Sequence, residues 1–405
     1  MVRIGRFPPF CKSLFRTARK FCGSCHLSHL WRIVMALASM HGRRSLSRIE
    51  DLTGERRTRQ AVSHFLTQAE WDAPGVLQHT ALSVLRRLGY RPGDTIYIVL
   101  DDTQIQKRGK QMDAVTKILL HAQKVYAQGH TVLGCVLIYR GVVIPYAVDV
   151  WTPRSFAGRP FRKLTQMAGD AVRSVQLPAG LRGVVLFDSY YLCPAVRDAC
   201  REKSFPYVGP AKKNRRFHPD GRPRDSRKLK TYGQQVLDRA GRVRTIRNKR
   251  YRLAERVGDL SKAGRVKLVF NREVRERGWR CLVTDCTRWS PQTILEHYLV
   301  RWGIELFFKV SKQNLGLGDY QLLRYTGVVR YLHLVLIAHL LLTHRALAEP
   351  DVQAQLKTRG ILRLPGTLQL QSILRTQLCH DALHQLEHGT RYRAAARKLR
   401  QLIRL

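Results

Sequence analysis

Two apolar stretches of the sequence end in aspartate. The run TIYIVL from Thr95 leads to Asp101 and Asp102, and the run GVVLF leads to Asp188. Such runs predict buried strands, and in open α/β sheets functional groups gather beyond the carboxyl ends of the strands. One aspartate in this position often only caps a turn or a helix. Two of them, in a chain with 29 acidic residues against 72 lysines and arginines, favour a metal site.

Asp101 and Asp102 are adjacent, so their side chains point to opposite faces if the strand continues through them. Only one of the two can then be the primary ligand. We favour Asp101 and keep Asp102 as the alternative.

A third carboxylate, Glu305, lies in the segment YLVRWGIELFFKVSKQ. Four residues are spaced there by three, four and seven: Tyr298, Arg301, Glu305 and Lys312. This spacing places them on one face of a single helix that is expected to begin near Pro291. Such a stripe is often only a solvated face with an Arg–Glu pair. Against that reading stand the apolar neighbours, which leave little of the helix free for solvent: Leu299, Trp302, Ile304, Leu306, Phe307 and Phe308.

Three carboxylates without a zinc-like Cys/His spacing predict hard cations with oxygen ligands, Mg²⁺ or Mn²⁺. Two such ions can activate a water or a DNA 3′-hydroxyl and stabilise the leaving oxygen of a phosphoryl displacement. A second cluster is formed by Cys22, Cys25, His26 and His29. It lacks the long loop between ligand pairs that a zinc finger needs.

The charge of the chain indicates a polyanionic partner. The formal net charge is +43, and the basic residues are spread along the whole sequence instead of forming one tail. The nine cysteines are scattered and no secretory signal is recognised, which favours free thiols in a reducing cytoplasm. The longest apolar run, from Val328, is interrupted by Arg330, His333 and His339. We therefore expect a buried helix there, and no membrane partner.

The elements that must position the carboxylates follow an α/β order. From Ser45 to about Gly89 the pattern is helical, and a tight turn near Gly54 suggests a helix-turn-helix. After the strand at 95–100, two strands are expected at 130–139 and 142–151, joined by a turn at Arg140 and Gly141. A helix, the strand that ends at Asp188, another helix and a short strand complete the layer.

The region 201–280 differs from the rest, because it holds 26 lysines or arginines against 8 acidic residues. It reads as a basic, β-rich insertion, and from Ser290 the pattern is helical again. The expected parts of the chain are a basic N-terminal extension (1–44), a helical DNA-binding domain (45–92), a first part of the catalytic core (93–204), the insertion (205–286), a second part of the core with the Glu305 helix (287–325) and a helical C-terminal region (326–405).

Between Thr95 and Gln321 the chain resembles bacterial insertion-sequence DDE transposases that carry a Tyr-x2-Arg-x3-Glu-x6-Lys motif. Tyr298, Arg301, Glu305 and Lys312 match that motif without a gap, and the segments LDDTQIQKRGK and LFDSYY are similar to those that hold the first and second catalytic aspartates of the family. The family places Thr or Ser two residues after the first aspartate. Thr103 takes that place when the aspartate is Asp101.

The resemblance implies an α/β fold with a ribonuclease-H-like mixed sheet flanked by helices. It implies that Asp101, Asp188 and Glu305 are catalytic and hold the metal. It also implies that Tyr298, Arg301 and Lys312 contact DNA phosphates, and Trp302 resembles a residue that stacks near a flipped base in hairpin-forming relatives.

The sequence thus predicts a bacterial DNA transposase that binds terminal inverted repeats, cleaves transposon ends and joins the 3′ ends to target DNA. We expect two metal ions, a homodimer in the synaptic complex, and a cytoplasmic, nucleoid-associated location. One alternative is a ribonuclease-H-like nuclease without strand transfer. Another is a catalytically silent DNA-binding protein derived from a transposase, although no member of the triad is missing.

Overall fold

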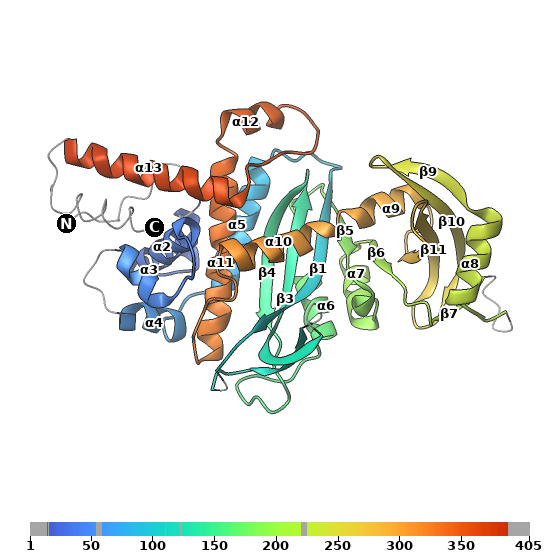
Figure 1. Ribbon diagram of the computed structural model, residues 1–405, viewed down its shortest axis with the longest axis horizontal. Coiled ribbons are helices and arrows are strands. Elements are labelled where there is room, and N and C mark those ends of the chain that lie inside the picture. Colours follow the sequence, from blue (N-terminus) through green and yellow to red (C-terminus); the bar gives the residue numbers. More distant parts are fainter. Residues whose placement is uncertain are drawn as a thin grey trace.

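A computed structural model of the chain describes residue 14 and residues 16–53, 59–109, 111–120, 124–219 and 225–387. Its centre is a mixed sheet flanked by helices, as the sequence predicted (Figure 1). The core strands are β1 (Thr95–Gln106), β2 (Thr116–Leu120), β3 (Val125–Tyr139), β4 (Val142–Val150), β5 (Arg182–Leu186) and β6 (Tyr207–Pro210). β1 pairs antiparallel with β3 on one side and parallel with β5 on the other.

Strand β1 is longer than the sequence suggested, and this corrects the position of the first carboxylates. The apolar run ends at Leu100, but the strand continues to Gln106 because β3 still offers pairing partners, with Gln106 opposite Gly129. The parallel partner β5 stops earlier, at Leu186, which pairs with Val99. Asp101 and Asp102 therefore lie inside β1, just beyond the point where its parallel neighbour ends.

The turn between β3 and β4 was predicted correctly. Arg140 and Gly141 both have positive φ angles, 51° and 82°, as a two-residue turn matched to the right-handed twist of a hairpin requires. Strand β2 was not predicted. It pairs with the first residues of β3 through Thr116 and Gly129, in a segment whose polar and apolar residues do not alternate.

Helices cover both faces of the core sheet. On one face lie α6 (Leu164–Ser174) and, between β5 and β6, the short η3 (Ser189–Tyr191) and α7 (Pro194–Glu202). Across the other face run α9 (Pro291–Leu299) and α10 (Trp302–Asn314) (Figure 1). The sequence predicted one continuous helix here. The structure has two, because the junction is tightened: Arg301 N–H donates to the carbonyl of Tyr298 and Gly303 N–H to that of Val300, each three residues back.

The basic insertion is β-rich, as expected, and it also contains one helix. Its elements are β7 (Arg216–His218), β8 (Arg227–Lys228), α8 (Leu229–Ala240), β9 (Arg242–Ile246), β10 (Lys249–Leu260), β11 (Gly264–Glu273) and β12 (Arg280–Thr284). β12 pairs with β6, with Leu282 opposite Pro210. The insertion and the core therefore share one 12-stranded sheet, in the order β2-β3-β1-β5-β6-β12-β11-β10-β7-β8, with β4 on β3 and β9 on β10.

The remaining helices form a bundle beside β4 (Figure 1). They are η2 (Thr17–Lys20), α2 (Ser24–Ser39), α3 (Leu46–Thr53), α4 (Arg59–Thr67), α5 (Ala73–Arg87), α11 (Tyr325–Ala346), α12 (Pro350–Leu356) and α13 (Thr367–Glu387). α2 falls within the expected extension 1–44, yet it packs on α11 and its Leu30 is fully buried. The expected tight turn near Gly54 lies outside the described residues.

The predicted buried helix after Val328 is α11. It is long and apolar enough to cross a membrane by length and composition, but 78% of its most apolar stretch is buried inside the protein. His333 and His344 are buried within it. α11 therefore has the packing of a core helix, since α2, α4 and α5 all contact it.

Candidate active site

Asp101 of β1 and Asp188, which follows β5, lie at equivalent positions along two neighbouring parallel strands. β1 and β5 are parallel and Val99 pairs with Leu186, so Asp101 and Asp188 each follow this pair by two residues. The backbone of Asp188 leaves the sheet at this point and turns into η3. This edge, where a parallel strand ends, is the place that the sequence predicted for the carboxylates.

The direction of Asp101 follows from its partner across the sheet. Asp101 pairs with Gly134 of β3, and paired residues present their side chains on the same face. A Cβ on Gly134 would lie 2.6 Å from Cζ of Phe308, a residue of α10. The sheet face that carries Asp101 is therefore the face on which α10 rests.

Arg301 joins Asp101 to Glu305. Its Nη1 donates to Oδ2 of Asp101 at 3.1 Å, and its Nη2 donates to Oε1 of Glu305, one helical turn further along. The guanidinium also lies over the ring of Tyr298, with 5.7 Å between its Cζ and the ring centroid. The side chains of Arg301 and Asp101 are largely withdrawn from solvent, with exposed fractions of 14% and 18%, whereas Glu305 keeps 32%. Two of the three candidate carboxylates thus converge on a single cation.

The environment of Asp101 raises its pKa to about 6. Burial is the main cause, and Arg301 opposes it, while the neighbouring carboxylates of Asp102 and Glu305 raise the pKa further. A carboxyl group that is costly to ionise without a cation nearby is typical of functional sites, although structural ion pairs give the same signature.

Asp102 points to the opposite side of β1. Its Oδ1 accepts a hydrogen bond of 2.6 Å from the hydroxyl of Tyr191 in η3. Tyr191 is fully buried, and burial together with Asp102 raises the pKa of its phenol strongly. Sequence reasoning did not single out Tyr191, although its place three residues after Asp188 is a local signal. Asp102 therefore has a structural partner that Asp101 does not share.

Asp188 opens into a cleft between the core and the insertion. The cleft has a volume of about 510 Å³ and is lined on the core side by Asp188, Tyr298, Arg301 and Trp302. Its other wall is formed by residues that the sequence did not suggest: Lys212, Lys213, Trp279 and Arg280. Only their place in a basic insertion could have pointed to them.

Two tryptophans mark the walls of this cleft. Trp302 is 66% exposed, which is unusual for an indole and leaves one large ring free at the start of α10. Across the cleft, the Nζ of Lys213 lies 4.1 Å from the centroid of the Trp279 ring. Trp279 itself is buried, so Trp302 is the exposed ring, and a ring of this kind beside the cations of the opposite wall suits a nucleic-acid strand.

Lys312 lies in the last turn of α10. Its Nζ donates to the backbone carbonyl of Gln104 in β1 at 2.7 Å. The structure thus brings Asp101, Arg301 and Glu305 into direct contact and Asp188, Tyr298 and Trp302 into the adjoining cleft. Lys312 lies outside this group, near the C-terminal end of α10.

The donor set suits a hard divalent cation, because Asp101 and Glu305 present carboxylate oxygens to one shared cationic group. In this arrangement the guanidinium of Arg301 lies between them. Within the described part of the chain, no three His, Cys, Asp or Glu side chains stand close enough together to hold one ion among them.

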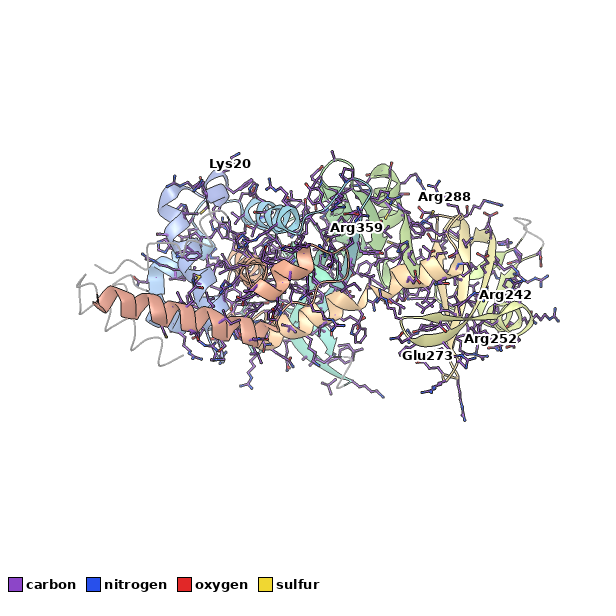
Figure 2. All side chains as sticks on the ribbon, turned by 90° about the horizontal axis from the view of Figure 1, so that it is seen from above. Lys20, Arg242, Arg252, Glu273, Arg288 and Arg359 are labelled. Carbon is purple, nitrogen blue, oxygen red and sulfur yellow. The ribbon has the colours of Figure 1, made fainter. Side chains whose placement is uncertain are left out.

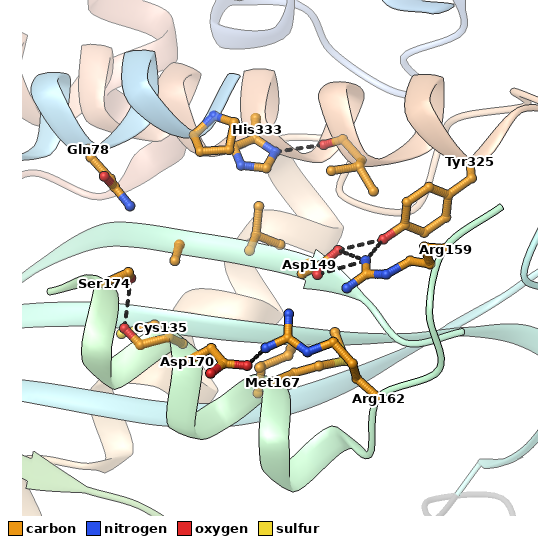
Figure 3. Close-up of a pocket in the computed structure, with 16 residues that line it drawn as sticks. Gln78, Cys135, Asp149, Arg159, Arg162, Met167, Asp170, Ser174, Tyr325 and His333 are labelled. Carbon is orange, nitrogen blue, oxygen red and sulfur yellow. Dashed lines mark hydrogen bonds and ion pairs between the residues drawn. The ribbon is translucent and has the colours of Figure 1, made fainter. Parts of the chain in front are cut away.

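A separate cavity of about 370 Å³ lies on the other face of the sheet, between α5, α6, α11 and the β3–β4 hairpin (Figure 3). Its carboxylates are paired: Asp149 binds Arg159 at 2.9 Å and accepts from the hydroxyl of Tyr325, and Asp170 pairs with Arg162. Each carboxylate of the cavity is therefore neutralised by an arginine of the cavity itself. This makes the cavity a weaker candidate for a catalytic site than the edge at Asp101.

Comparisons with known proteins indicate the family of the chain. The model of the DDE superfamily endonuclease family matches residues 20–268, more than half of the chain, including Asp101 and Asp188 but ending before Glu305. One relative, named "Probable transposase for insertion sequence element IS701", from Microchaete diplosiphon, is 22% identical over 338 residues, which are 78% of this chain and 81% of the relative. The family predicted from the sequence is thereby confirmed, and the chain belongs to the DDE superfamily of endonucleases.

Proposed function

We propose that the protein is a cut-and-paste DNA transposase that binds terminal inverted repeats, cleaves the transposon ends and joins their 3′ ends to target DNA. The observation that carries this proposal is the contact of Arg301 with both Asp101 and Glu305, beside the cleft that Asp188 lines. Membership of a DNA-cleaving superfamily supports it, and so does the printed name of the insertion-sequence relative.

Members of this superfamily generally use divalent metal ions. Here we propose two ions, Mg²⁺ or Mn²⁺, with Asp101, Asp188 and Glu305 as the ligands. When bound, they would activate the attacking hydroxyl and stabilise the leaving oxygen. The proximity of Asp101 and Glu305 supports this assignment, because carboxylate oxygens are the donors that these ions prefer and both carboxylates are directed to one point, where Arg301 now lies. Asp102 is the less favoured first ligand because it already bonds Tyr191.

The residues of the cleft would hold and orient the DNA. Tyr298 and Arg301 lie beside the carboxylates, and they would bind phosphate oxygens next to the scissile bond. Trp302, exposed at the mouth of the cleft, would stack on a base. Lys312 would contact the backbone further along α10. The cations on the insertion wall, Lys213 and Arg280, would neutralise the strand from the other side.

Synapsis of two transposon ends requires two active sites, so we propose a homodimer at work. The partner DNA comprises the terminal inverted repeats and the target. We place the protein in the bacterial cytoplasm, bound to the nucleoid, because its substrate is there and its net charge of +43 favours DNA.

A strand-joining assay on pre-cut transposon ends tests the proposal. Incubation with Mg²⁺ and a supercoiled target should yield joined products that depend on a free 3′-hydroxyl. Ends blocked by a 3′-dideoxy nucleotide are the matched control and should give none. Cleavage without any joined product would identify a nuclease and contradict the transposase proposal. Specific binding to ends without cleavage or joining would identify a catalytically silent DNA-binding protein.

A further inference from the structure

A groove lies at the start of strands β1 and β5, at the end opposite the candidate active site. It consists of two adjoining hollows of about 530 and 740 Å³. The hollows share five lining residues: Ser204, Phe205, Pro206, Cys286 and Arg288. We call this pair of hollows the rear groove. Because they share walls, the rear groove is longer than one small anion would need.

The position of the rear groove separates it from the catalytic edge. Thr95 and Arg182, which pair at the start of β1 and β5, line its larger hollow. Asp101 is six residues further along β1, which is about 20 Å at roughly 3.3 Å per residue. The Thr95 end of the rear groove is therefore remote from the scissile phosphate, whereas its His297 end directly precedes Tyr298 of the active-site cleft.

The lining of the rear groove is cationic. Arg182, Lys203 and Arg288 line the larger hollow, and Arg201 and Arg288 line the smaller one. Arg288 is exposed, and Figure 2 labels it on the edge of the molecule. Among the described residues, no side chain or backbone group forms an ion pair or hydrogen bond with the side chain of Lys203 or Arg288. These two cations are thus available to a ligand.

The other cations and the acid in the groove have partners. Arg182 donates to the backbone carbonyl of Gly93 at 2.9 Å, and Arg201 pairs with Asp198 at 3.2 Å. Asp285 is the acidic residue of the lining, and its carboxylate accepts the backbone N–H of Tyr207 at 3.1 Å. The field in the groove is therefore positive.

Aromatic rings accompany the cations. Trp289 and His297 meet edge to face with 4.7 Å between their ring centroids, and Phe205 lines both hollows. An elongated, positively charged groove with rings along it suits a nucleic-acid strand, whereas a free phosphate would need donors that converge on one point.

We infer that the rear groove binds a DNA phosphodiester backbone, with its Thr95 end about 20 Å from Asp101. The inference rests on the proposed function only in taking DNA as the partner. A duplex and a single strand share this backbone chemistry. The test distinguishes them, and it does not use catalysis.

The test compares two double charge reversals in the full chain, in EDTA so that no DNA is cleaved. Lys203→Glu with Arg288→Glu changes the groove. Lys230→Glu with Lys357→Glu, two exposed lysines on α8 and at the end of α12, changes the net charge equally elsewhere. Binding of a labelled random-sequence duplex and of labelled oligo(dT) is measured by anisotropy over a series of salt concentrations.

We expect the groove variant to reduce the magnitude of the slope of log K against log salt by about 2, since each lost phosphate contact removes roughly 0.9 for duplex DNA. The control variant should keep nearly the wild-type slope. A change with duplex alone identifies the duplex as the occupant, and a change with oligo(dT) alone identifies a single strand.

Unchanged slopes with both probes would overturn the inference, and so would equal changes in both variants. Thermal melting of each variant checks folding, and the milder pair Lys203→Gln with Arg288→Gln should lower the slope in the same direction. Loss of cleavage by a catalytic variant addresses the proposed function alone, so the two failures remain distinguishable.

Discussion

Arg301 donates a hydrogen bond of 3.1 Å to Asp101, although 200 residues separate them in the chain. The same guanidinium contacts Glu305. One side chain at the junction of α9 and α10 thus brings a residue of β1 and a residue of α10 into one partly buried cluster.

Glu305→Gln should abolish cleavage and joining while leaving binding to transposon ends nearly intact. Loss of a group that merely orients a metal ligand costs about 10–100-fold, so loss of a ligand itself should cost at least about 100-fold. Cleavage of a labelled end and a gel-shift assay measure the two effects. Glu296→Gln, at an exposed position of α9, is the matched control and should remain active. Undiminished catalysis by Glu305→Gln would refute the assignment.

Asp101→Asn and Asp102→Asn should have different effects. Asp101 faces Arg301 and Glu305, so Asp101→Asn should abolish cleavage. Asp102→Asn weakens a buried bond to Tyr191 and should mainly lower the free energy of unfolding, by about 1–3 kcal/mol. Tyr191→Phe removes the same bond and should resemble it. The reverse pattern, with Asp102 essential and Asp101 dispensable, would make Asp102 the first ligand.

Arg301→Gln should make the protein more dependent on divalent metal. The change leaves Asp101 and Glu305 facing each other without the cation that neutralises them, which should cost about 3–5 kcal/mol of stability without metal. Melting temperatures with and without MgCl₂ measure this. The rise on adding Mg²⁺ should be larger in the variant than in the wild type, and an equal rise would show that Arg301 does not compete for these carboxylates.

Gly134→Ala should disturb the packing of α10 on the sheet. The added Cβ would lie 2.6 Å from Cζ of Phe308, and overpacking of this kind costs about 1–3 kcal/mol. Urea unfolding measures the loss, and cleavage should fall as well because Asp101 is the partner of Gly134. Gly109→Ala, where a Cβ meets nothing within 4 Å, is the control. The double variant with Phe308→Leu should recover part of the stability.

The contribution of His339 and His344 to stability should fall as the pH drops from about 6.5 towards 4, against a smaller opposing gain from Asp101, whose pKa is raised to about 6. Burial lowers the pKa of both His339 and His344 to about 4, and Arg87 adds to the effect at His344. Between about pH 6.5 and pH 4 these histidines are protonated in the unfolded chain but neutral in the folded protein. Because the unfolded state binds more protons, the free energy of unfolding decreases as the pH falls to about 4. Urea unfolding at several pH values measures the slope. His344→Gln should flatten it, and an unaltered slope would contradict the role of His344.

Much of the core and of the candidate site could be predicted from the sequence because the relevant signals are local. The run before Asp101, the turn at Arg140 and Gly141, and the spacing around Glu305 each depend on a few neighbouring residues. The extension of β1 to Gln106 depends instead on β3, and no local pattern reports a partner strand. The same holds for the choice between Asp101 and Asp102, which depends on Tyr191 and Arg301.

The insertion wall of the cleft was beyond sequence reasoning for a related reason. Lys213 and Trp279 are 66 residues apart in a segment with many cations, and only the pairing of β6 with β12 brings them to the same place opposite Trp302. The break between α9 and α10 was also missed, because a helical spacing does not show where i→i−4 bonds give way to tighter ones.

The hydrogen bonds between β6 and β12 have a mechanical consequence. They make the insertion a continuation of the core sheet, which restrains the two walls of the cleft from swinging apart as hinged domains do. We expect the incoming strand, and not the protein, to deform on binding. The cost of kinking or unstacking then falls on the DNA, and end sequences with flexible steps would be preferred even where no side chain reads a base.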